Sequence, residues 1–110
     1  MRIETFDQPN VKVVALIGKL DTNTAPEVET SLQELVEHGH HKILIDFTDL
    51  DFVSSAGLRI LLLTAKKLSR AGGALRVCSL NETVQDIFDM SGFASLLQVF
   101  DDQQTALADF

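Results

Sequence analysis

The sequence contains no tryptophan or tyrosine, two prolines and a single cysteine, Cys78, among its 110 residues. One cysteine cannot form a disulfide within the chain, and Cys78 falls in an apolar stretch, so we expect a buried and reduced thiol. Such cysteine usage is typical of a cytoplasmic protein, and we expect that location. The residues before Asn10 lack the apolar core of a secretion signal, so we also expect no signal peptide.

Basic residues are scarce as well, because nine Lys and Arg stand against sixteen Asp and Glu and leave a net charge of −7. Without a long basic stripe, a nucleic acid is not expected as a partner. No apolar run approaches the length that crosses a bilayer, so we expect no membrane insertion. The chain is long enough for one hydrophobic core, and residues 1–110 are interpreted as a single domain.

The apolar periodicity predicts strands and helices in the order ββαβαβαβα, with about four helices. The first two strands are joined by a short turn at residues 8–10, which predicts an antiparallel hairpin. The alternation that follows favours parallel pairing, so the expected fold is α/β with a mixed, mostly parallel sheet of four to five strands. The strands are expected at residues 2–6, 11–17, 43–45, 74–80 and 96–100.

Polar residues at the expected helix starts predict the N-caps. Thr22 or Thr24 is expected to cap the first helix, where residues 24–27 fit a capping box. Asn81 and Asp101 are expected to cap the last two helices in the same way.

The central stretch, residues 42–70, passes from a short apolar run through a polar turn into a helical pattern. Ser54 and Ser55 fall at the start of that helix, and one of them is expected to be its N-cap. Three- and four-residue steps place one apolar set on a common helical face, which we expect to be buried. Its members are Leu58, Leu61, Leu62, Ala65 and Leu68.

Catalytic and metal-binding interpretations fail on residue type and spacing. A nucleophile elbow needs Gly-x-Ser-x-Gly, but Val53 occupies the first glycine position and no histidine follows Ser55. The three histidines, His38, His40 and His41, match no zinc-binding spacing. We therefore expect a protein that is not an enzyme and that has no metal site or cofactor.

The segment IDFTDLDFVSSAGLRILLLTAKKL resembles the signature of the STAS domain in bacterial anti-sigma factor antagonists. In that signature an aspartate, a turn and an aromatic residue precede small-Ser-small-Gly-Leu and an apolar helix. A Gly-x-Leu-Asp turn at residues 18–21 and a Ser-Gly-aromatic sequence at residues 91–93 add weaker similarity. The resemblance spans about residues 11–100 and implies a single STAS-type domain.

The resemblance also implies a function. In the family, the serine two residues before the glycine is phosphorylated by a partner kinase, and that position is Ser55, with Ser54 as the runner-up. The implied protein sequesters an anti-sigma factor serine kinase, is switched off by phosphorylation, and has a serine phosphatase as a further partner. Many members carry Asp where this chain has Ser54, which leaves two candidate hydroxyls. STAS domains also occur in proteins that are never phosphorylated, so an accessory STAS subunit of a lipid-transport complex or sensory scaffold, without a switch, stays open.

The expected partner surface joins the turn at Ser54 and Ser55, here called the serine turn, to the outer face of the following helix. Helical geometry places Arg59, Leu63, Lys67 and Arg70 opposite the apolar face. The resemblance places Asp21 near the phosphorylation site, whereas its residue type alone indicates only a turn-supporting role. The predicted partner contacts are Asp21, Thr22, Ser54, Ser55, Gly57, Arg59, Leu63 and Lys67.

Overall fold

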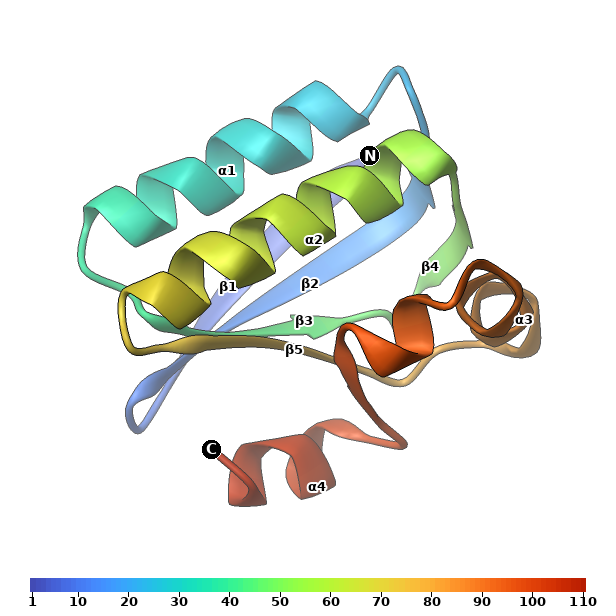
Figure 1. Cartoon of the computed structure of the whole chain (residues 1–110). Helices are drawn as coiled ribbons and strands as arrows, with labels where there is room; N and C mark the ends of the chain where they lie inside the picture. Colours follow the sequence, from blue (N-terminus) through green and yellow to red (C-terminus); the bar gives the residue numbers. More distant parts are fainter.

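The computed structural model describes all residues from 1 to 110, and the chain forms a mixed β-sheet with helices against both faces (Figure 1). The strands are β1 (Arg2–Gln8), β2 (Val11–Leu20), β3 (Lys42–Asp46), β4 (Leu50–Val53), β5 (Ala74–Cys78) and β6 (Gln98–Phe100). The helices are α1 (Ala25–Glu37), α2 (Ser55–Arg70), α3 (Glu82–Ser91) and α4 (Gln103–Ala108), with a 3-10 turn, η1 (Phe93–Ser95), before β6.

The sheet has the order β1-β2-β3-β5-β6, with β4 beside the far end of β2. β1 and β2 form the predicted antiparallel hairpin, with Arg2 opposite Ile17 and Gln8 opposite Val11. Every other strand pair is parallel. The predicted class, α/β with a mixed and mostly parallel sheet, is therefore confirmed.

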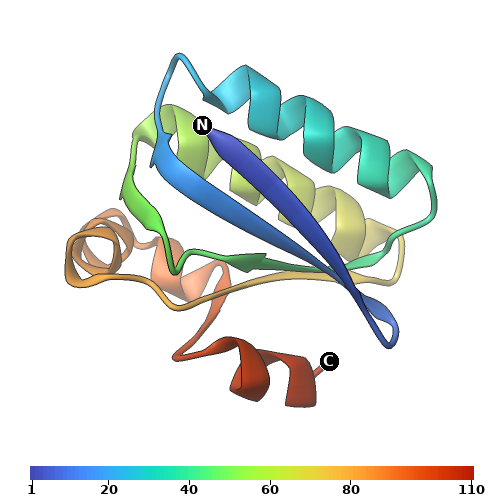
Figure 2. The ribbon, with the colours of Figure 1, turned by 180° about the vertical axis from the view of Figure 1, so that it is seen from behind.

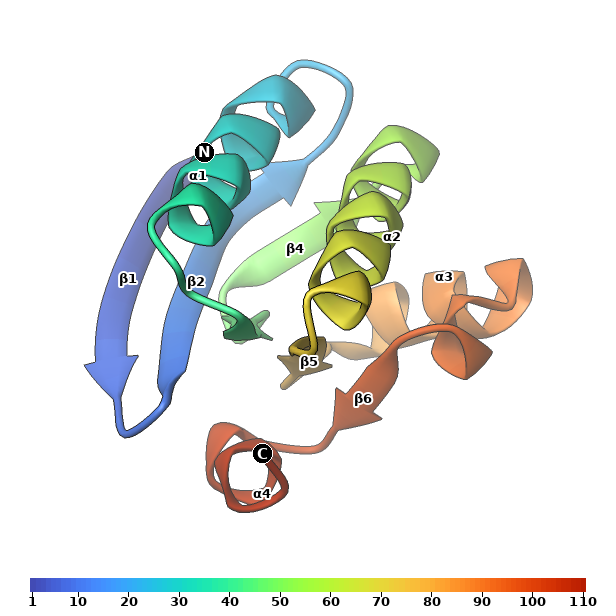
Figure 3. The same cartoon turned by 60° about the vertical axis from the view of Figure 1, so that its left-hand side comes forward.

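Alternation along the strands divides the apolar side chains between two helical layers. On β2, Val14 and Leu16 belong to the larger core cluster, while Val11 and Val13 belong to a smaller one. α1 and α2 cover the face with the larger cluster and α4 lies on the opposite face, as Figure 3 shows. Seen from behind, the β1–β2 hairpin lies in front of α2 (Figure 2). Both faces of the central strands are thus withdrawn from water.

The α4 layer is held to the sheet by Arg76 of β5. Its guanidinium lies 4.5 Å from the centre of the Phe110 ring, and it pairs with Asp109 at 3.1 Å. Arg76 also donates a hydrogen bond to the backbone carbonyl oxygen of Asp109 at 2.7 Å. Ala106 of α4 and Cys78 of β5 are both fully buried, which confirms the expectation that Cys78 is a core residue.

One strand more than expected is present. Residues 48–51 were interpreted as a polar turn, but Leu50–Val53 forms β4 and pairs with β2. Only Leu50 and Val53 of this strand are buried, so its apolar spacing does not follow the alternation that marks a half-buried strand. The turn itself is confined to the preceding residues, where Asp46 accepts hydrogen bonds from the backbone and side chain of Thr48.

Two of the predicted helix caps are also corrected. Thr24 occupies the N-cap position of α1, as expected, but its hydroxyl does not form the capping box, because it donates to the Lys19 carbonyl oxygen and accepts from the Asp21 N–H. α4 is capped by Asp102 rather than Asp101, since Asp102 accepts from the Thr105 N–H at 2.7 Å. That bond holds the pKa of the Asp102 carboxyl below its ordinary value.

The cap of α3 and the buried face of α2 agree more closely with expectation. Asn81 caps α3 by accepting from the Val84 N–H at 2.8 Å. Of the five residues expected on the buried face of α2, Leu58, Leu61 and Leu68 are buried and the other two are partly exposed. Ile60, which was not expected there, is only 8% exposed because α1 packs alongside α2.

Burial of Cys78 predicts a decline in stability at alkaline pH. Burial raises the pKa of its thiol from 9.0 to about 11, so between these values the unfolded chain loses this proton before the folded chain does. The free energy of unfolding should therefore fall as pH rises from 9 towards 11. Denaturant unfolding of the wild type and of Cys78→Ala across that range tests this, and equal slopes for the two proteins would contradict it.

Candidate functional site: the serine turn

Strand β2 pairs with β3 along its first part and with β4 at its end, and this change of partner positions the site. Residues 12–15 of β2 pair with β3, whereas Leu20 lies opposite Val53 of β4. The change of partner falls between Ala15 and Gly18, and the register of the β2–β4 pair then shifts after Gly18. The φ of Gly18, 112°, suits glycine, and its N–H donates to the Asp49 carbonyl oxygen. Because β2 and β4 are parallel, the segments that follow them emerge at the same edge of the sheet.

The two serines that follow β4 have different roles. The Ser54 N–H donates to the Leu20 carbonyl oxygen at 2.8 Å, and the Ser54 hydroxyl accepts from the Gly57 N–H at 3.3 Å, which makes Ser54 the N-cap of α2. Ser55 is the first residue of α2, it is exposed, and its hydroxyl makes no hydrogen bond within the chain. The expectation that one serine caps the helix is confirmed, and the other hydroxyl is free.

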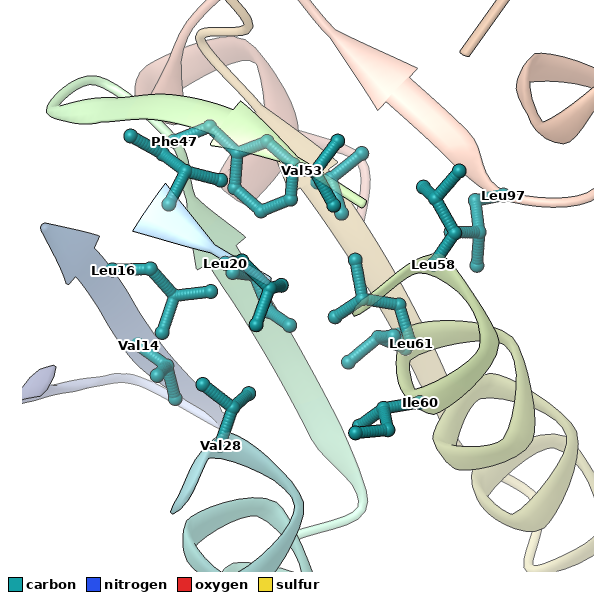
Figure 4. Close-up of a cluster of buried hydrophobic side chains, with 14 of the residues drawn as sticks. Val14, Leu16, Leu20, Val28, Phe47, Val53, Leu58, Ile60, Leu61 and Leu97 are labelled. Carbon is teal, nitrogen blue, oxygen red and sulfur yellow. The ribbon is translucent and has the colours of Figure 1, made fainter. Parts of the chain in front are cut away.

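Gly57 allows the first turn of α2 to lie against β2. A Cβ atom at this position would come within 2.5 Å of the Leu20 Cγ atom and within 3.1 Å of Val53 Cγ2. Leu20, Val53, Leu58 and Leu61 converge here from β2, β4 and α2, as Figure 4 shows. Gly57, one of the predicted partner contacts, is buried, and the structure gives it a role in this close packing.

Asp21 organises the loop beside the serine turn. Its Oδ1 atom accepts hydrogen bonds from the backbone N–H groups of Asn23 at 2.9 Å and Thr24 at 3.1 Å. This is the local, turn-supporting role that its residue type indicates. The backbone of Asp21 is also adjacent to the serine turn, because the preceding residue, Leu20, is hydrogen-bonded to Ser54.

The loop and the serine turn enclose a shallow pocket of about 320 Å³. Thr22 and Pro26 line it from one side, and Ser55 and Arg59 from the other. The predicted contacts Thr22, Ser55 and Arg59 therefore share one surface. Pro26 was not predicted, and its adjacency to the serines follows from α1 and α2 lying side by side, which no local sequence motif reports.

The start of α2 differs electrostatically from the other helix starts. α1 and α3 each carry a glutamate in the first turn, Glu27 and Glu82, and α4 is capped by Asp102. α2 has a neutral cap and no acidic residue in its first turn. A helix N-terminus favours negative charge, and in α2 the sequence supplies none.

The structure contains no group of three or more His, Cys, Asp or Glu side chains that could hold a metal ion. None of its helices combines the length and apolar character needed to cross a membrane.

Residues 2–106, nearly the whole chain, match the family model of the STAS domain. The chain belongs to the STAS family. The family implied by the sequence signature around the serines is therefore confirmed.

Relatives of this STAS domain are named as anti-sigma factor antagonists. BtrV of Bordetella bronchiseptica, so named, is 36% identical over 107 residues, covering 96% of this chain and 92% of that protein. The anti-sigma F factor antagonist of Paenibacillus polymyxa is 29% identical and covers 99% of this chain and 94% of its own length. The Bacillus cell fate determinant SpoIIAA, solved in its phosphorylated form, has the same fold, with a TM-score of 0.74, 18% identity and 98% of each chain covered.

The capping geometry predicts different stability effects for substitutions of the two adjacent serines. Ser54→Ala removes the cap of α2 and should lower the free energy of unfolding by about 1 kcal/mol, or roughly 4–8 °C in melting temperature. Ser55→Ala removes an exposed, unbonded hydroxyl and should change it by less than about 0.5 kcal/mol. Calorimetry of both variants decides the matter, and a larger loss for Ser55→Ala would reverse the assignment of the cap.

Proposed function

We propose that this STAS domain is an anti-sigma factor antagonist that binds an anti-sigma factor kinase and is released when that kinase phosphorylates Ser55. The observation that carries the proposal is the division of roles between adjacent serines. Ser54 is committed to the helix cap, while the hydroxyl of Ser55 is exposed and unbonded at the start of α2. A kinase can reach this hydroxyl without first breaking an internal bond.

The start of α2 accommodates a phosphate. Phosphorylation adds about −1.5 to −2 charges, and the free N–H groups of a helix start stabilise an anion there. Because neither the cap nor the first turn of α2 contains a carboxylate, no neighbouring negative charge within that turn opposes the modification. The phosphorylated domain is therefore expected to keep its fold.

The switch acts on the partner rather than on the fold. A partner that covers the serine turn would have to bury the phosphate without a matching cation, and burying an unpaired charge costs several kcal/mol. Each 1.4 kcal/mol changes a dissociation constant about tenfold, so this cost is enough to release the kinase. The names of the relatives and the phosphorylated form of SpoIIAA support this proposal.

Substitution of the serines tests the switch. Ser55→Ala should bind the cognate kinase but resist phosphorylation, whereas Ser55→Asp should bind it at least about tenfold more weakly, because one carboxylate reproduces part of the phosphate charge. Ser54→Ala is the matched control and should still be phosphorylated. Titration calorimetry and mass-spectrometric site mapping give the readouts.

Two results would count against the switch. Phosphate found on Ser54 instead of Ser55 would refute the site. If neither serine is modified and Ser55→Asp keeps every partner bound, the domain is an accessory subunit without a phosphoswitch.

The local role of Asp21 calls for a charge-only substitution. Asp21→Ala removes the acceptor for the Asn23 and Thr24 N–H groups and should cost about 1 kcal/mol of stability, so a slower phosphorylation of this variant would be ambiguous. Asp21→Asn keeps an acceptor oxygen and removes only the charge. If the carboxylate helps to position the kinase's nucleotide and metal, Asp21→Asn should slow phosphorylation at unchanged melting temperature. If Asp21→Asn is phosphorylated at the wild-type rate, the role of Asp21 is limited to supporting the turn.

A further inference from the structure

The charges of α2 are one-sided in a chain that is acidic overall. α2 carries four cations, Arg59, Lys66, Lys67 and Arg70, and no carboxylate, whereas the whole chain has a net charge of −7. The three salt bridges of the structure use Arg2, Lys12 and Arg76. None of the four cations of α2 therefore forms a salt bridge within the chain.

A groove between α1 and α2 brings these cations beside an apolar surface. The groove has a volume of about 310 Å³, and the two helices that form it lie side by side on one face of the sheet (Figures 1 and 3). Its apolar lining consists of Val36 of α1 and Ile60 and Leu63 of α2. Its basic lining consists of Lys66, Lys67 and Arg70.

Leu63 is the accessible apolar residue of the groove. It is 53% exposed although it lies between cations, while Ile60 beneath it is 8% exposed and belongs to the core. Because Leu63 is exposed and lies next to the core residue Ile60, it is a suitable contact for an apolar side chain of another molecule. Isolated exposed leucines are common, and it is the unpaired basic rim that distinguishes this one.

We propose that the α1–α2 groove binds an acidic amphipathic segment of the partner protein, with an apolar side chain against Leu63 and carboxylates against Lys66, Lys67 and Arg70. Charge complementarity identifies the occupant, because an unpaired basic rim around an apolar floor matches alternating acidic and apolar residues. Glu29 lines the groove towards the serine turn, so the acidic part of the segment lies towards the end of α2. The identification of the partner as a kinase rests on the proposed function.

The groove and the switch act at separate points on one helix. Lys67 follows Ser55 by twelve positions, or about 18 Å of helix. Exposed charges interact weakly beyond about 8 Å at physiological ionic strength. The groove therefore anchors its segment whether or not Ser55 carries negative charge, and the serine turn alone responds to phosphorylation.

A direct binding experiment tests the groove without the kinase. The chain has no tryptophan or tyrosine, so a peptide carrying one tryptophan can be followed by fluorescence without background from the protein. The probe is a helical peptide of about five turns with leucines on one face and glutamates elsewhere, and its counterpart has lysines in place of the glutamates. The full-length protein should bind the glutamate peptide at least about tenfold more tightly than the lysine peptide, and the affinity should fall with added salt.

Matched variants locate the binding site. Leu63→Gln and the double variant Lys67→Glu/Arg70→Glu should each weaken binding of the glutamate peptide at least about tenfold. Leu63→Gln should leave the melting temperature unchanged, whereas the double variant should lower it slightly, because it reverses the cations at the negative end of α2. The controls are Leu96→Gln, which alters a leucine that is 59% exposed outside the groove, and Lys19→Glu/Lys42→Glu, which makes the same charge change elsewhere. Both controls, and also Ser55→Asp, should bind within about twofold of the wild type.

Several outcomes would overturn the groove proposal. One is equal affinity for the glutamate and lysine peptides, and another is an equal loss in the control variants. Sedimentation showing a dimer that Leu63→Gln dissociates would assign the groove to a second copy of the chain, and binding to phosphatidylglycerol vesicles without peptide binding would assign it to a membrane. If Ser55 is never phosphorylated but the peptide results hold, the groove proposal stands and the phosphoswitch fails.

Discussion

The serine turn depends on the backbone hydrogen bond that Ser54 donates to the carbonyl oxygen of Leu20. This bond extends the β2–β4 pairing by one step and fixes where α2 begins. It also brings the first turn of α2 so close to β2 that only glycine fits at position 57. Because β2 is paired with β1, β3 and β4, the turn is attached to the most extensively paired strand of the sheet. The free hydroxyl of Ser55 is therefore presented from a rigid platform rather than from a loop.

The sequence identified the fold class and both serines but not the strand that carries them. Apolar runs such as Ile43–Ile45 are buried on both faces and are easily predicted. β4 is short and contains the exposed residues Asp51 and Phe52, so its pattern resembles a turn, and only its position beside β2 makes it a strand. Ser54 could not be distinguished from Ser55 beforehand, because both are good N-caps and the choice depends on backbone geometry.

The exposed side of α2 was predictable in part, for reasons of the same kind. Helical periodicity correctly placed Arg59, Leu63 and Lys67 on the exposed side of α2, because that side is set by local geometry. Gly57 was predicted as a contact with them because it belongs to the motif, although it is buried and allows α2 to pack closely against β2. The groove with α1 was not predictable, since it requires the lateral contact of two helices that the topology alone brings together.

The two ends of α2 complement its dipole unequally, and this asymmetry relates the proposed phosphorylation site at one end to the proposed binding groove towards the other. Lys67 and Arg70 in the last turn compensate the negative end of the helix, as cations in that position do. The positive end has no such compensation, whereas each of the other three α-helices has a carboxylate at its start. Within this chain, a negative charge at the start of α2 would have to come either from a carboxylate in the cap position or from modification of a side chain there. In this chain the cap is the neutral Ser54, so the anion that compensates the positive end of the α2 dipole would be a phosphate on Ser55.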